Sequence, residues 1–165
     1  MKILGIDPAI RVTGFGLIQT ENGKISLINC GKVSTHSQTP FSKRLEKIYD
    51  SLLRLVKRHR PSYVVVEKLY SHYKHPTTAY YLGQVQGLIY LICGKKGIPL
   101  VEYNSTRVKK AITGKGNASK LQVQRMVEYL LSLKKNIWCS DIFDALSLAI
   151  AHAYIMRVQR DNFKS

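Results

Sequence analysis

The sequence predicts an α/β fold: a mixed five-stranded sheet with helices on both faces, in a single domain that spans residues 1–165. The main observation is the order of the elements, in which three consecutive strand patterns precede helical patterns that alternate with two more strands. Strands joined by hairpins lie antiparallel and strands joined through a helix lie parallel, so one sheet must contain both kinds of pair. The length allows one well-buried core and is too short for two ordinary domains.

The first three strands form a predicted antiparallel meander. The apolar run at residues 3–6 stops on a carboxylate, Asp7, and a proline then blocks continuation of the strand. A second apolar stretch at residues 13–20 should return beside the first as a hairpin, with Asp7 at its head. An Asn-Gly pair then predicts a tight turn into a third strand at residues 24–35.

The rest of the chain alternates helices with two short strands. Thr39 as the N-cap and Pro40 in the first turn predict a helix that ends at Pro61. The last expected helix is apolar on nearly every side, which predicts that it packs deep against the sheet. The other expected elements are a strand at 63–66, a helix at 77–93, a strand at 98–103, helices at 104–112 and 119–131, and the last helix at 141–158.

The charge balance indicates a polyanionic partner. The chain has 26 Lys and Arg against 10 Asp and Glu, a net charge of +16. This charge would also suit a ribosomal protein or a protein of the membrane surface. No apolar run approaches the ~18 residues of a membrane span, and the start lacks the pattern of a secretory signal, so we expect a cytoplasmic protein. The three cysteines have no metal-ligand spacing and are expected to be reduced, buried thiols.

Four acidic residues occupy positions that the fold alone explains poorly. Asp7 and Glu67 each end an apolar strand, and if those strands are parallel neighbours, about 4.8 Å apart, both side chains emerge at one edge of the sheet. Asp141 and Asp144 share a face of the first turn of the last helix. Separate structural explanations exist: a turn cap for Asp7, a salt bridge to Lys68 or a neighbour for Glu67, and a favourable helix dipole for the two aspartates.

One metal site would account for all four carboxylates together. Converging carboxylates repel one another and stay ionised only if hard cations neutralise them, and Mg²⁺ prefers such oxygen ligands. Two Mg²⁺ ions about 3.5 to 4 Å apart would stabilise the attacking and leaving oxygens of a phosphodiester displacement. The alternative is a non-catalytic basic nucleic-acid-binding protein, which the charge allows but which gives no account of the carboxylates.

The chain resembles the RuvC family of Holliday junction resolvases in five stretches: GIDPAIRVTGFG, VVVEKLY, YLGQVQGL, VKKAITGKGNASKLQVQRMV and DIFDALSLAIAH. The resemblance implies a ribonuclease H-like fold and a homodimer that nicks two symmetric strands of a four-way DNA junction, with two Mg²⁺ ions per active site. It also implies the RuvAB branch-migration complex as a partner. The catalytic and metal-binding carboxylates that it implies are Asp7, Glu67, Asp141 and Asp144. The first motif also begins actin-like sugar kinases, but this chain has no room for their second domain.

The sequence departs from the family pattern at three positions. Ala9 stands where the family commonly has glycine, and its methyl group is tolerated only if φ is negative there. Asp141 stands where some relatives have histidine, so the chemistry of the third ligand varies. Tyr70 stands where the family often carries phenylalanine.

Two segments are expected to contact DNA. Residues 68–75 interleave basic and aromatic side chains, and Tyr70 is the candidate to stack on an unpaired base, an interaction worth about 1 to 3 kcal/mol. Lys109, Lys115 and Lys120 are candidates for contacts with backbone phosphates. The resemblance places Lys109 and Lys120 near the scissile phosphate. The structural alternative is an exposed tyrosine and a solvated basic face.

Two further expectations concern helices. His152 follows Asp144 by eight residues, more than about 10 Å along the axis, so we expect a buried, hydrogen-bonded histidine rather than a ligand. A two-fold junction suits a two-fold protein, and the helix that carries Gly83 and Gly87 is the candidate for the interface. Packing of that helix on its own sheet is the alternative.

Overall fold

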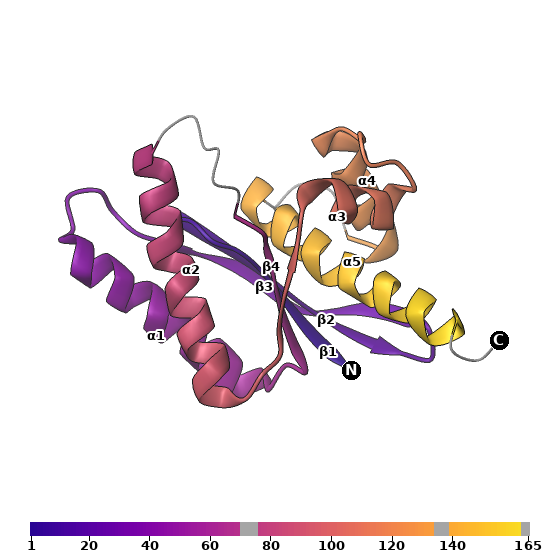
Figure 1. Ribbon diagram of the computed structural model, residues 1–165, viewed down its shortest axis with the longest axis horizontal. Helices are drawn as coiled ribbons and strands as arrows, with labels where there is room; N and C mark the ends of the chain where they lie inside the picture. Colours follow the sequence, from indigo (N-terminus) through magenta and orange to yellow (C-terminus); the bar gives the residue numbers. More distant parts are fainter. Residues whose placement is uncertain (70–75, 134–138, 163–165) are drawn as a thin grey trace.

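The computed structural model describes residues 1–69, 76–133 and 139–162 (Figure 1). Its strands form one five-stranded sheet in the order β3-β2-β1-β4-β5. The pairs β1–β2 and β2–β3 are antiparallel, whereas β1–β4 and β4–β5 are parallel, so the predicted mixed sheet is confirmed. The strands are β1 (Lys2–Asp7), β2 (Val12–Glu21), β3 (Lys24–Ser34), β4 (Tyr63–Glu67) and β5 (Leu100–Tyr103).

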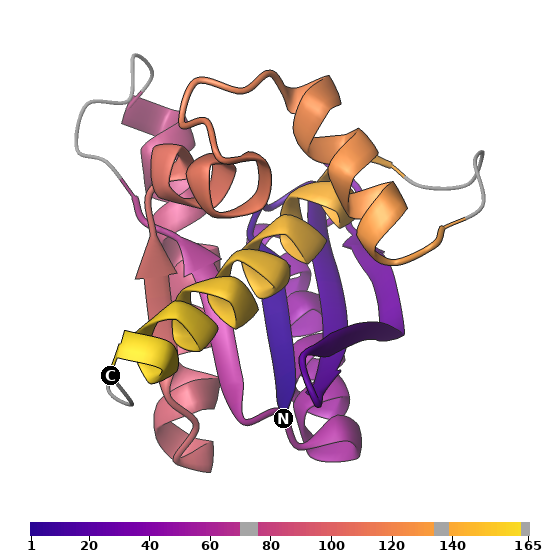
Figure 2. The same ribbon diagram turned by 90° about the vertical axis from the view of Figure 1, so that its right-hand side faces the viewer.

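Helices cover both faces of the sheet, as predicted. Helices α1 and α2 lie on one face, and α3, α4 and α5 lie on the other (Figure 1). Figure 2 shows α5 running across the strands. Among the described residues, no helix is long and apolar enough to cross a membrane. The helices are α1 (Phe41–His59), α2 (Pro76–Lys96), α3 (Ser105–Thr113), α4 (Lys120–Leu130) and α5 (Ser140–Asn162).

Successive side chains of each strand point to opposite faces of the sheet, so the core has two layers. In β4, Val64 and Val66 pack in the layer of α1 and α2, whereas Val65 packs in the layer of α3 to α5. In β1, Ile6 belongs to the first layer and Ile3 to the second. Both faces of the central strands are therefore buried, which explains their continuous apolar runs.

Helix α5 lies directly on β1 and β2 because glycines face it there. A Cβ added at Gly5 would overlap the carbonyl oxygen of Ala145, and one added at Gly14 would overlap the carbonyl oxygen of Asp141. Side chains at these two positions would force the helix away from the sheet. The two glycines thus place the first turns of α5 beside the carboxyl end of β1.

Two expected element starts are wrong. Thr39 does not cap α1, because Pro40 occupies the N-cap position and no side chain caps the helix. The backbone N–H of Thr39 instead donates to His36 in the preceding turn, 3.1 Å. The fifth strand begins at Leu100 rather than at Ile98, because the N–H of Ile98 donates to the carbonyl of Cys93 and closes the end of α2, 3.0 Å. The three cysteines are free thiols, and only Cys93 is fully buried.

Candidate active site

Asp7 and Glu67 lie at the same edge of the sheet, as predicted. Strands β1 and β4 are parallel neighbours with Ile6 opposite Val66, and the two carboxylates belong to the next residue of each strand. Neither carboxylate accepts a hydrogen bond or forms an ion pair with any residue that the structure describes. The turn-cap explanation of Asp7 and the Lys68 salt bridge of Glu67 are therefore not supported by the contacts.

Asp141 and Asp144 reach this edge from α5. Gly14, which pairs with Asp7 across β1 and β2, touches the backbone of Asp141. Asp141 lies in the first turn of α5, where the helix dipole favours a negative charge, and Asp144 lies almost one turn further on. The glycine contact therefore carries both aspartates to the end of β1.

The four carboxylates lie within electrostatic reach of one another. Burial raises the pKa of Asp7 to about 7, and the negative charges of Asp144, Asp141 and Glu67 add to that rise. Burial, followed by the charge of Asp144, also raises the pKa of Glu67. A group of acids whose pKa values are raised in this way is a candidate functional site.

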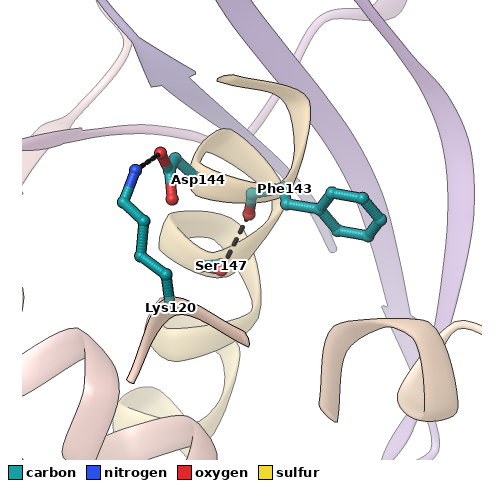
Figure 3. A network of polar contacts seen from close by, with 4 residues as sticks. All are labelled: Lys120, Phe143, Asp144 and Ser147. Atoms are coloured by element: carbon teal, nitrogen blue, oxygen red, sulfur yellow. Dashed lines mark hydrogen bonds and ion pairs between the residues drawn. The ribbon is translucent and has the colours of Figure 1, made fainter. Parts of the chain in front are cut away.

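Two lysines face the carboxylates and oppose their repulsion. The Nζ of Lys120 donates to Oδ2 of Asp144 at 2.7 Å, as Figure 3 shows. Its positive charge lowers the pKa of Asp7, and together with the charge of Lys109 it lowers that of Glu67. Glu67, Asp144 and the two lysines line one cavity of about 140 Å³. The site thus combines acids with cations, an arrangement suited to binding a phosphate beside a metal.

Helix caps hold both lysines in place. Asn104 caps α3, which carries Lys109, by accepting from the N–H of Arg107 at 2.9 Å. Ser119 and Gln122 form a reciprocal capping box at the start of α4, where Lys120 is the first residue. Ser147, which also lines the cavity, donates its hydroxyl to the carbonyl of Phe143 at 2.7 Å within α5 (Figure 3). That hydroxyl is therefore already satisfied by its own helix.

The donor set suits a hard divalent cation. Among the described residues it consists of carboxylates, without thiolate or imidazole, and oxygen ligands are those that Mg²⁺ prefers. In residues 1–69, 76–133 and 139–162, no three acidic, histidine or cysteine side chains are oriented to hold one ion together. The carboxylate of Asp144 instead forms an ion pair with the ammonium group of Lys120. Burial is the largest cause of the raised pKa of Asp7, and the neighbouring carboxylates add a repulsion that a cation at this edge would relieve, so the residues fit Mg²⁺ by the chemistry of their donors.

The other predicted DNA contacts have different outcomes. Tyr70 lies outside the described residues. Lys109 and Lys120 lie beside the carboxylates, whereas Lys115 lines a separate groove on α4. Ala9 fits its turn, because the non-glycine residues with positive φ in the described chain are elsewhere. The hydroxyl of Thr13 donates to the carbonyl of Ala9 at 2.7 Å and stabilises that turn.

Sequence reasoning missed the residues that position the carboxylates. Gly5 and Gly14 set the depth of α5, and a glycine inside an apolar strand is the signal that could have found them. Tyr103 was also missed: it pairs with Glu67 across β4 and β5, and its hydroxyl lies 2.8 Å from Nδ1 of His152. His152 is 2% exposed, as the expectation of a buried, hydrogen-bonded histidine required. This contact ties α5 to the strand beside Glu67.

Comparisons with known proteins point to one family. Residues 3–152 match the family model described as crossover junction endodeoxyribonuclease RuvC. Proteins of that name are similar over most of their length: the one from Pelotomaculum thermopropionicum is 37% identical over 154 residues, 93% of each chain. The one from Brevibacillus brevis is 40% identical over 153 residues, 93% of this chain and 92% of the relative.

Solved structures agree with this result. Thermus thermophilus RuvC in complex with a Holliday junction substrate is 31% identical, with a TM-score of 0.87 and 96% of each chain covered. A second structure of Thermus thermophilus RuvC is 33% identical, with a TM-score of 0.89 over 96% of this chain and 97% of that one. The fowlpox virus Holliday junction resolvase, 16% identical, has a TM-score of 0.61 over 93% and 98% of the two chains and shows the fold alone. These likenesses confirm the expected ribonuclease H-like fold.

Proposed function

The chain belongs to the RuvC family of crossover junction endodeoxyribonucleases, and we propose that it resolves Holliday junctions in DNA recombination and repair by Mg²⁺-dependent nicking of two symmetric strands. The observation that carries the proposal is the convergence of four carboxylates at one sheet edge, where the pKa of Asp7 rises to about 7. Structure alone gives no reason to collect so much negative charge in a chain of net charge +16.

In this mechanism Asp7, Glu67, Asp141 and Asp144 would hold two Mg²⁺ ions. These ions would supply Lewis-acid activation of a water and charge stabilisation for the departing oxygen. Asp7 and Glu67 hold their positions from the rigid strand ends, and Asp141 and Asp144 hold theirs from α5. Carboxylates on regular elements keep the precise geometry that an in-line displacement needs.

The two lysines of the site bind the scissile phosphate. Lys120 pairs with Asp144, and a phosphate that enters the cavity would compete for the same ammonium. Lys109 lies on the Glu67 side and offers a second positive charge. Both charges face the negative charge that grows on the phosphate oxygens in the transition state, so they stabilise it electrostatically.

The substrate and partners that we propose are those expected of the family. The Thermus relative is described in complex with a Holliday junction, and we extend that substrate to this chain. We further propose a homodimer through the outward face of α2, where a Cβ added at Gly83 or Gly87 would meet no described residue within 4 Å. Tyr70 stays a predicted stacking residue, the RuvAB branch-migration complex a predicted partner, and the cytoplasm the predicted location.

A cleavage assay on synthetic DNA tests the function. A four-way junction and a duplex of the same arm sequence are incubated with the protein in Mg²⁺ or in EDTA. We expect paired, symmetric nicks only on the junction and only in Mg²⁺. The Asp7→Asn variant should bind the junction with unchanged affinity and leave it intact.

Each other outcome has a distinct meaning. Nicking by Asp7→Asn at the rate of the unaltered protein would refute the metal assignment. Equal cutting of junction and duplex would refute junction specificity. Tight junction binding without nicking in either buffer would favour the non-catalytic nucleic-acid-binding alternative.

A further inference from the structure

A second hollow lies on α4, separate from the carboxylate cavity. It has a volume of about 420 Å³ and shares none of its lining residues with that cavity. We call it the α4 groove, and its lining includes Lys115, Ala118, Gln122, Arg125, Met126 and Tyr129. The proposed cleavage mechanism uses no residue of this groove.

The α4 groove combines an exposed ring with an apolar floor and a basic rim. The side chain of Tyr129 is 80% exposed, more than any other large apolar or aromatic side chain in the described part of the protein. Arg125 precedes it by four residues and so lies on the same face of the helix. Met126 and Ala118 add apolar surface, and none of the described residues that line the groove is acidic. Neither Lys115 nor Arg125 is in an ion pair with another described residue.

The groove is held rigid before any ligand binds. Val123 and Val127 bury the opposite face of α4 in the core, and the capping box at Ser119 fixes its first turn. The hydroxyl of Thr113 accepts from the N–H of Lys115 at 3.2 Å, which ties down the loop that carries this lysine. A preformed groove loses little entropy when it takes a ligand.

Residues of α4 line both the groove and the carboxylate cavity. Lys120, the first residue of that helix, contacts Asp144 at 2.7 Å. Tyr129 lies nine residues later, about 14 Å along the helix axis, and at 3.6 residues per turn it lies on the opposite face of α4 from Lys120. A strand that contacts both sites must therefore pass around this helix.

We propose that the α4 groove binds one unpaired nucleotide of a DNA strand, with its base against Tyr129 and Met126 and its phosphate at Arg125 and Lys115. The inference rests on the proposed function and names a further contact of the same substrate. A basic groove with an exposed aromatic ring is the arrangement by which proteins hold single strands. The bases of a duplex arm are stacked and paired, so they cannot reach the ring.

Fluorescence anisotropy on a single strand tests the proposal. The probes are a labelled 12-nucleotide oligo-dT and a blunt duplex of equal length, both in EDTA. Tyr129→Ala should weaken single-strand binding about 5- to 100-fold and leave duplex binding unchanged, whereas Tyr129→Phe keeps the ring and should bind normally. Arg125→Ala should reduce the slope of log affinity against log salt by about 0.7.

Lys57→Ala is the matched control, because Lys57 is an exposed cation of α1 on the other face of the sheet. It should leave single-strand affinity within about twofold of the unaltered protein. Unchanged single-strand binding by Tyr129→Ala would overturn the proposal, and so would equal weakening of single strand and duplex. If the unaltered protein failed to nick junctions while Tyr129→Ala still lost single-strand binding, the groove would stand and the proposed function would fall.

Discussion

Asp7 is held in an environment that opposes its charge. Burial and three neighbouring acids raise its pKa from 3.8 to about 7. Because the folded pKa lies above the unfolded one, the folded protein binds more protons between these values, and without metal its stability falls as pH rises from about 4 to 7. The metal-free protein is therefore destabilised at the pH at which a carboxylate ligand is needed.

Asp7→Asn should stabilise the metal-free protein, because the amide carries no charge to bury. We expect the free energy of unfolding at pH 8 to rise by about 1 to 4 kcal/mol, with a smaller gain at pH 5. Urea denaturation in EDTA at the two pH values measures both. Lower stability of the variant at pH 8 would show that Asp7 makes favourable contacts that outweigh the repulsion.

Lys120→Met should slow cleavage without preventing DNA binding. The variant keeps much of the aliphatic length of lysine but removes the charge that faces Asp144 and the phosphate. We expect single-turnover nicking of a bound junction to fall about 100-fold. Lys57→Met, which removes a charge on the other face of the sheet, is the control and should nick at the unaltered rate; equal rates for the two variants would contradict a role for Lys120.

At the scale of elements, the contact between α5 and β1 decides where two of the four acids lie. Gly5→Ala should place a methyl group against the carbonyl of Ala145 and push the helix outward. We expect a cost of about 1 to 3 kcal/mol in stability and a larger loss of nicking, because Asp141 and Asp144 move with the helix. Denaturant unfolding and the junction assay measure the two effects.

Gly94→Ala is the control for this substitution. Gly94 lies in α2, and a Cβ there would meet nothing within 4 Å. The change should stabilise the protein by up to about 1 kcal/mol through helix propensity. A neutral result for Gly5→Ala would show that α5 does not depend on the glycine for its position.

The sequence was most informative where the pattern is local. Apolar runs bounded by turn residues predicted every strand, and the rule that parallel strands share an edge predicted that Asp7 and Glu67 would meet. The sequence predicted that α5 packs deep against the sheet, but it did not pair the helix with Gly5 and Gly14, because that contact joins segments distant in the chain. The Lys120–Asp144 pair spans 24 residues and has no periodic signal.

At the scale of the whole molecule, the two layers of helices have different proposed tasks. The layer of α3 to α5 supplies Asp141, Asp144 and both lysines of the site, and it carries the α4 groove. The other layer, α1 and α2, exposes the outward face of α2. Leu91 lies there, eight residues after Gly83, and is 47% exposed. Gly83, Gly87 and Leu91 follow helical spacing and form the proposed dimer face.

Leu91→Asp should convert the proposed dimer into a monomer, because it places a charge in an apolar contact. Sedimentation velocity measures the change, and the monomer should nick one strand of a junction where the dimer nicks two. Val158→Asp, at an exposed apolar position on α5, is the control and should remain dimeric. If Leu91→Asp sedimented as a dimer, the interface would have to lie elsewhere than on α2.

The most direct test of the account is the effect of Mg²⁺ on thermal unfolding of the protein and its Asp7→Asn variant at pH 8. The four acids of β1, β4 and α5 are proposed to hold divalent cations together. Millimolar Mg²⁺ should therefore raise the Tm of the unaltered protein by several degrees, and Ca²⁺ should do so too, while the variant, already more stable in EDTA, should gain much less. An equal response of the two proteins to Mg²⁺, or none in either, would contradict this proposal.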